Sequence, residues 1–165
     1  IKTLDELVWA TNPEQDTLEG LAGYLAEFAP GFLEAHGLGC ELDLPAQLPP
    51  LRLPAQARHN LFLIAKEALR NTAQQAGATR VRVVMNLADH ERRLTIEDDG
   101  RGLTGTHNHQ RAVQASPAGE AGGPEAAAGN GLRNMRARAE AVGRKLVLEP
   151  AVPRGTRLSV LVPLD

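Results

Sequence analysis

The sequence is poor in aromatic residues and contains a single cysteine. Phe, Trp and Tyr make up 3% of the 165 residues, too few to build a platform on which nucleic-acid bases could stack. Cys40 lacks a second cysteine for a disulfide, which excludes a small secreted fold held by such bridges. No apolar run approaches the roughly 20 residues of a membrane-spanning helix, and the first residues carry no signal-peptide pattern. With these classes excluded, the composition indicates an ordinary globular domain.

Charge is distributed unevenly along the chain. Residues 1–50 hold nine acidic side chains against one basic residue, Lys2, whereas residues 51–165 hold eleven acidic and seventeen basic side chains. A cationic C-terminal part suits an anionic ligand, although a solvated Arg-rich surface would show the same count. The length suits one compact domain. Because the chain begins with Ile1 rather than methionine, we expect it to be a piece of a longer protein.

Apolar spacing predicts alternating helices and strands. Asp16 and Glu19 look like a capping box at the start of a helix that runs to about His36, and Pro54 suits the first position of a second helix that ends near Gln75. Leu132 and the apolar residues that follow it mark a third helix. Alternating patterns predict strands near residues 40–44, 81–87, 94–98, 145–149 and 156–162. We therefore expect an α/β fold, a two-layer sandwich of a mixed sheet covered on one face by helices.

A polar face on the second helix is the first candidate for chemistry. Glu67, Asn71 and Gln74 are spaced by four and then three residues, which stacks them on one side. A carboxylate and an amide oxygen one turn apart are hard ligands that suit Mg²⁺. An ordinary polar helix face would show the same residues.

The run from Glu97 to Gly102 at the end of a strand is the second candidate. Asp98 shares strand parity with Leu94 and Ile96, so it points toward the helices, where an unpaired carboxylate is costly. A hydrogen-bond donor from a ligand would satisfy it. Gly100 and Gly102 allow a ligand to approach the backbone closely, but acids and glycines are also good turn formers.

The third candidate follows a stretch without periodicity, about residues 103–129, which is typical of a functional loop or lid. Gly129, Asn130, Gly131 and Leu132 then open a helix, where free N–H groups favour an anion; a plain helix cap would look alike. Thr156, on the last strand, shares parity with inward residues and faces the same side as Asp98 if the strands pair.

Taken in order, these motifs resemble the GHKL ATPase domain, the superfamily of gyrase, heat-shock chaperones, mismatch-repair ATPases and sensor histidine kinases. The motifs are Glu-x-x-x-Asn, Asp-x-Gly-x-Gly, Gly-x-Gly-Leu and Gly-Thr. Within the superfamily, LDELVWATNPEQDTLEGLAGYLAEFAPGFL and RHNLFLIAKEALRNTAQQAGAT look like bacterial two-component sensor kinases. The resemblance implies the Bergerat fold over residues 13–165, with residues 1–12 as the tail of an upstream dimerisation helix and an ATP lid at about 103–129.

The resemblance also implies roles for individual residues in a site for ATP and Mg²⁺. Asp98 would accept a hydrogen bond from the adenine amino group, assisted by Thr156 through a water, and Asn71 would coordinate Mg²⁺. Glu67 would be the catalytic base or polarising group near the γ-phosphate. The remaining ATP-binding positions it implies are Gly100 against the base, Gly102 at the start of the lid, Gln74 on the helix, and Gly129, Gly131 and Leu132 at the end of the lid.

Two departures from related kinases stand out. Where they commonly carry Lys and His after the asparagine, this chain has the neutral amides Gln74 and Gln75, so phosphate stabilisation differs. None of the five histidines sits in a phosphoacceptor helix. The implied partners are ATP, the phosphoacceptor helix of the same full-length dimeric kinase and a downstream response regulator, with no direct nucleic-acid contact.

The resulting hypothesis is the ATP-binding domain of a sensor histidine kinase that phosphorylates a histidine outside this chain. It would be a cytoplasmic part of a larger sensor that is membrane-anchored or free. An anti-sigma-type serine kinase shares the same motifs, and a non-enzymatic nucleotide-binding pseudokinase is favoured only by Gln74 and Gln75.

Overall fold

The computed structural model describes residues 2–75, 77–87, 91–102 and 124–162. Residues 103–123 of the predicted lid lie outside these residues. Within the described ranges, no helix combines the length and apolar character needed to cross a membrane. The elements in chain order are α1 (Lys2–Thr11), the 3₁₀ turn η1 (Pro13–Gln15), α2 (Leu18–Ala35), β1 (Gly39–Asp43), α3 (Ala55–Gln75), β2 (Arg80–Asn86), β3 (Arg93–Asp98), α5 (Pro124–Ala141), β4 (Leu146–Pro150) and β5 (Thr156–Leu161).

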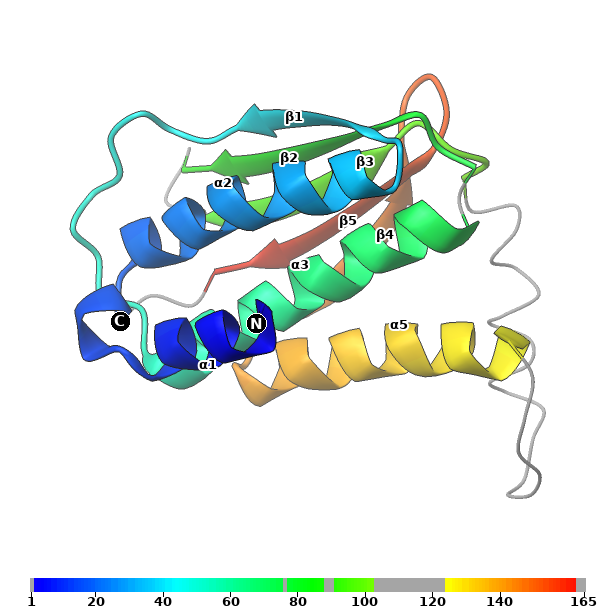
Figure 1. Cartoon of the computed structure of the whole chain (residues 1–165). Helices are drawn as coiled ribbons and strands as arrows, with labels where there is room; N and C mark the ends of the chain where they lie inside the picture. The colour runs from blue at the N-terminus through cyan, green and yellow to red at the C-terminus, as the bar shows by residue number, and fades with distance from the viewer. Residues whose placement is uncertain (1, 76, 88–90, 103–123, 163–165) are drawn as a thin grey trace.

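Five strands form one mixed sheet in the order β1-β2-β3-β5-β4. β1 runs parallel to β2, and every other neighbouring pair is antiparallel. Figure 1 shows α2, α3 and α5 lying across one face of this sheet. The predicted two-layer α/β fold with a mixed sheet is therefore confirmed.

The core lies between the helices and the covered face of the sheet. On β2 alternate residues are buried, and on β3 the predicted inward residues Leu94, Ile96 and Asp98 are buried, in agreement with the predicted strand parity. Thr95 of β3 is buried as well, on the opposite face, where its hydroxyl lies 3.2 Å from that of Ser159. The predicted inner side of α3 is buried along its whole length, from Leu61 to Thr72. Aliphatic side chains dominate this interface; its fully buried members include Leu21, Leu25, Leu33, Leu61, Ile64, Leu69, Val81 and Val83. Because the core needs only these residues to face inward, the opposite strand positions are free to be polar.

The uncovered face of the sheet carries a row of charges that alternates in sign. The pairing register sets one residue from each strand side by side in the order Glu41, Arg82, Glu97, Arg157 and Glu149. Arg157 Nε donates to Glu97 at 2.9 Å, and Arg82 Nε lies 3.4 Å from Glu41. We refer to these five residues as the charge row. Opposite charges on adjacent strands stabilise the pairing by roughly 0.2–1 kcal/mol each.

The start of α2 differs in detail from the prediction. Thr17, not Asp16, is the N-cap, and its hydroxyl accepts from the Gly20 N–H at 3.0 Å. The predicted capping box with Glu19 is therefore wrong. Asp16 is instead drawn to Arg58 of α3, whose guanidinium lies 2.9 Å from its carboxylate. A hydrogen bond between two charged groups is among the stronger ones in proteins.

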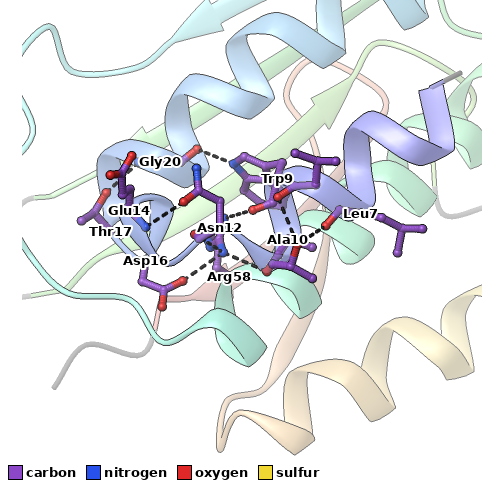
Figure 2. Close-up of polar contacts among 11 residues, drawn as sticks. Leu7, Trp9, Ala10, Asn12, Glu14, Asp16, Thr17, Gly20 and Arg58 are labelled. Carbon is purple, nitrogen blue, oxygen red and sulfur yellow. Dashed lines mark hydrogen bonds and ion pairs between the residues drawn. The ribbon is translucent and has the colours of Figure 1, made fainter.

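Arg58 also holds the end of α1, as Figure 2 shows. Its side chain is fully buried and donates to the carbonyl oxygens of Trp9 at 2.7 Å, Ala10 at 3.0 Å and Asn12 at 3.3 Å. The last carbonyls of a helix have no partner within the helix, and a cation there is favoured by the helix dipole. Arg58 therefore caps α1 from a distant part of the chain.

Trp9 anchors the same helix through its ring. The indole stacks on Tyr24 with 4.3 Å between ring centroids and contacts Phe62 edge-on, while the Arg58 guanidinium lies 4.4 Å from its centroid. The end of α1 is thus part of the domain core. The relation of residues 1–12 to an upstream dimerisation helix stays a prediction.

Candidate functional site

Asp98 lies at the end of β3 and is 8% exposed, on the face covered by helices, as its strand parity predicts. Its Oδ1 accepts the Gly100 N–H at 2.8 Å and the Thr156 N–H at 3.4 Å. The Thr72 hydroxyl lies 3.4 Å from Oδ2 but also donates to the carbonyl of Ala68 at 3.0 Å. A hydroxyl has one proton, so Thr72 gives Oδ2 only a long bond that competes with the shorter bond to Ala68. Oδ2 is therefore left with acceptor capacity.

Burial raises the pKa of the Asp98 carboxyl, while its hydrogen bonds to Gly100, Thr156 and Thr72 oppose the rise. A buried acceptor with incomplete hydrogen bonding is an unfavourable arrangement for the protein alone. It becomes favourable when a ligand brings a donor to the open oxygen. This is the strongest chemical feature of the site.

Thr156 lies next to Asp98 and contacts it with its backbone. Thr156 begins β5 and is half-buried, in phase with the buried residues Leu158 and Val160. Its N–H, rather than its hydroxyl, is the group that contacts Asp98. The predicted parity is therefore confirmed, and a role for its hydroxyl through a water stays a prediction.

Gly102 and Gly155 allow the two loops to approach closely. Gly155 has φ +105°, and a Cβ there would overlap with the carbonyl of Asp98; Gly102 has φ +78°, and its Cβ would lie 3.1 Å from the Gly155 carbonyl. Neither position accepts a side chain without moving the other loop. These positions therefore require glycine for the packing of the two loops, independently of any ligand.

On α3, Glu67 and Asn71 are half-buried and Gln74 is exposed. Glu67 pairs with Arg70 at 3.9 Å. A Cβ on Gly131 of α5 would overlap with Glu67 Oε1 and lie 3.6 Å from Asn71 Nδ2. The structure therefore brings Glu67, Asn71 and Gly131 together, as the motifs suggested, with Gln74 one turn further along the helix.

The prediction that Gly129 to Leu132 open a helix is wrong. α5 begins at Pro124, so Gly129 and Gly131 lie inside it, and Asn130 Oδ1 accepts from Arg133. The alanine-rich segment 125–128 favours a helix strongly, and proline suits its first position. The free N–H groups of a helix start are therefore not at Gly129 and Gly131. Leu132 is half-buried against the core.

Sequence reasoning missed the residues that hold the Asp98 turn in place. Asp99 accepts from Thr79 and Arg80, and Arg154 donates to the carbonyls of Asp99 and Gly100. Asp99 lies within the Asp-x-Gly-x-Gly motif, at a position that the motif leaves open, and its partners are about twenty residues away in the sequence. Among the described residues, no cluster of three or more His, Cys, Asp or Glu side chains forms a candidate metal site.

Known proteins resemble this chain in sequence and in fold. The family model described as histidine kinase-, DNA gyrase B-, and HSP90-like ATPase matches residues 56–165, more than half of the chain. The sensor histidine kinase MctS of Rhizobium johnstonii is 28% identical over 144 residues, covering 87% of this chain and 28% of MctS. NarS of Mycobacterium tuberculosis, also a sensor histidine kinase, is 35% identical over 104 residues, covering 63% of this chain and 21% of NarS.

Solved structures show the same fold. The histidine kinase domain of the blue-light activated kinase EL346 from Erythrobacter litoralis has a TM-score of 0.60 at 19% identity, covering 90% of this chain and 64% of that domain. The histidine kinase AdeS of Acinetobacter baumannii has a TM-score of 0.59 at 14% identity, covering 98% and 77%. This chain spans less than a third of the curated relatives above.

Proposed function

Since this chain belongs to the histidine kinase-, DNA gyrase B-, and HSP90-like ATPase family and is an ATP-binding domain of the sensor histidine kinase type, we propose that it binds Mg-ATP for transfer of the γ-phosphoryl group to a histidine outside this chain. The kinase would be dimeric and would pass the phosphoryl group to a response regulator. The domain would lie in the cytoplasm. The comparisons favour neither the serine kinase nor the pseudokinase, for which only Gln74 and Gln75 speak.

Asp98 is the residue that supports this proposal most directly. An adenine amino group would donate to the open Oδ2, which the protein itself satisfies only at 3.4 Å through Thr72. Gly100 is buried and its N–H fixes Oδ1, so the base would lie against a backbone without a side chain. A ligand with a donor at this place removes the cost of the buried carboxylate.

Asn71 and Glu67 supply oxygen ligands of the kind that Mg²⁺ prefers, on one face of α3. Bound Mg²⁺ would neutralise charge on the phosphates. Asn71 would hold it through its amide oxygen, with phosphate oxygens and water completing the shell. Glu67 would orient the incoming histidine or accept its proton. Gly131 leaves room for these two side chains.

The amides at Gln74 and Gln75 would leave the triphosphate with less positive charge than in related kinases. We therefore propose that position 74 lies near the β- and γ-phosphates without neutralising them, where charge matters most for transfer. The substitution Gln74→Lys would then raise affinity for ATP more than for adenosine, and added salt would reduce the gain.

Isothermal titration of this chain with Mg-ATP tests the proposal. The wild-type protein should bind, and Asp98→Ala should weaken binding about ten- to hundredfold, because a hydrogen bond to a charged group contributes roughly 1.5–3 kcal/mol. Glu149→Ala is the matched control, since Glu149 is exposed on β4 and faces away from the helices. Equal affinities of the wild type and Asp98→Ala would refute the adenine assignment.

A further inference from the structure

The turn that begins at Asp98 is held on one side by the start of β2. Asp99 Oδ1 accepts the N–H groups of Thr79 at 2.8 Å and Arg80 at 3.0 Å, and Oδ2 accepts the Thr79 hydroxyl at 2.6 Å. Three donors converge on one carboxylate, and two of them are backbone groups whose positions are set by the sheet. The side chain of Asp99 therefore ties the turn to a rigid element.

The other side of the turn is held by the last two residues of the β4–β5 loop and by the first residue of β5. Arg154 Nε donates to the carbonyls of Asp99 at 2.9 Å and Gly100 at 3.2 Å. Gly155 packs its backbone against the Asp98 carbonyl, and the Thr156 N–H reaches the Asp98 side chain. Residues 154–156 thus contact residues 98–100 one after another.

These two supports act on the direction of the Asp98 carboxylate. The Gly100 N–H fixes Oδ1 at 2.8 Å. The direction in which Oδ2 points is therefore fixed as long as Gly100 stays in place. Arg154 holds Gly100 by donating to its carbonyl. Asp99, the residue before Gly100, holds it by tying the backbone to Thr79 and Arg80. A carboxylate that cannot rotate accepts from a donor at one place and repels an acceptor at the same place.

We propose that Arg154 and Asp99 are positioning residues that set the selectivity of this site for 6-aminopurine over 6-oxopurine nucleotides. The inference rests on the proposed adenine-binding role of Asp98. Without the two supports, Asp98 can turn or move away from the oxygen of a 6-oxopurine, so the site loses discrimination rather than general affinity. Neither residue has to touch the nucleotide for this effect.

The test compares the dissociation constants of ADP and IDP for this chain by titration calorimetry with Mg²⁺ present. The quantity of interest is the ratio of the IDP constant to the ADP constant. Arg154→Ala and Asp99→Ala should each lower this ratio about three- to tenfold, the effect of losing one or two ordinary hydrogen bonds. ADP binding should weaken while IDP binding changes little.

Two variants control for structural damage. Asp99→Asn retains an oxygen for the two backbone donors and offers an N–H to the Thr79 hydroxyl, so it should keep the wild-type ratio. Arg157→Ala removes another arginine close in sequence, but this one pairs with Glu97 on the uncovered face, and it too should keep the ratio.

The outcomes separate this inference from the proposed function. If the wild type binds neither nucleotide, the proposed function fails and the inference fails with it. If the wild type discriminates and Arg154→Ala and Asp99→Ala keep its ratio, the inference alone is overturned. If these variants lose affinity for ADP and IDP equally, the residues have only a structural role, which also overturns it.

Discussion

The buried guanidinium of Arg58 provides the sharpest test of how this domain is held together. The substitution Arg58→Met keeps an apolar stem of similar length but removes every donor. The carbonyls of Trp9, Ala10 and Asn12 and the carboxylate of Asp16 then lose the partner that they share. We expect the end of α1 to separate from α3.

The expected loss in stability follows from the burial of the pair. Removing one member of a buried ion pair costs about 3–5 kcal/mol. The Asp16 side chain keeps 20% of its exposure, so water can hydrate it after the substitution, and we expect the lower end, about 3 kcal/mol. For a domain of this size, that corresponds to a fall in Tm of about 6–12 °C.

Trp9 makes this change measurable at the place where it occurs. It is the single tryptophan of the chain, and the Arg58 guanidinium lies 4.4 Å from its ring. Urea unfolding followed by fluorescence reports on α1, whereas far-UV circular dichroism reports on the whole fold. In Arg58→Met the fluorescence transition should begin at lower urea than the dichroism transition.

Lys66→Met is the matched control. It removes the bond of 2.6 Å between Lys66 and Glu6, which joins the same two helices, but the Lys66 side chain is 40% exposed. Such a pair contributes at most about 1 kcal/mol. If Arg58→Met and Lys66→Met lower the free energy of unfolding equally, the assignment of Arg58 as the main tie of α1 is refuted.

Three further predictions concern the site. Asp98→Asn should raise Tm at pH 7, because burial raises the pKa of Asp98 and so penalises its ionised form in the folded state. The same variant should weaken nucleotide binding. A lower Tm in calorimetry would contradict the first expectation. The hydrogen bonds to Thr79 lower the pKa of Asp99 to about 2 from 3.8, so its ionised form contributes stability above pH 4 that is lost as the pH falls toward 2. Asp99→Asn should flatten this part of the pH profile of urea unfolding, and an identical profile would refute it. Gly131→Ala should lower the free energy of unfolding in urea by about 1–3 kcal/mol, because its methyl group would overlap with Glu67. Gly23→Ala is the control and should not destabilise the domain, since the space around Gly23 is open. Equal effects of the two variants would show that α5 shifts freely.

The sequence predicted those features of the fold that depend on local periodicity. Strand parity correctly placed Asp98 on the covered face, and the apolar spacing of α3 identified its buried side. Both signals are carried by neighbouring residues, because side-chain direction follows from the backbone repeat alone. The mixed sheet followed from the order of these elements.

Features that depend on distant partners could not be predicted in the same way. Arg58 looks like a solvated residue in the sequence, because its acceptors are backbone carbonyls 46 to 49 residues earlier. The start of α5 was missed because alanine favours a helix without giving it an apolar stripe. Asp99 and Arg154 are joined through a turn whose geometry arises only when β3 and β5 pair.

The charge row on the open sheet has a consequence for how molecules of this protein meet in solution. Its signs read the same from either end, with Glu97 of β3 in the middle. If two molecules stacked their open sheets in register, in either orientation, each glutamate would face a glutamate and each arginine an arginine. Like charges brought together in this way cost several kcal/mol. The charges on the uncovered face therefore attract one another between neighbouring strands of one sheet and repel the same face of a second molecule. This favours separate domains in solution over domains stacked through their sheets.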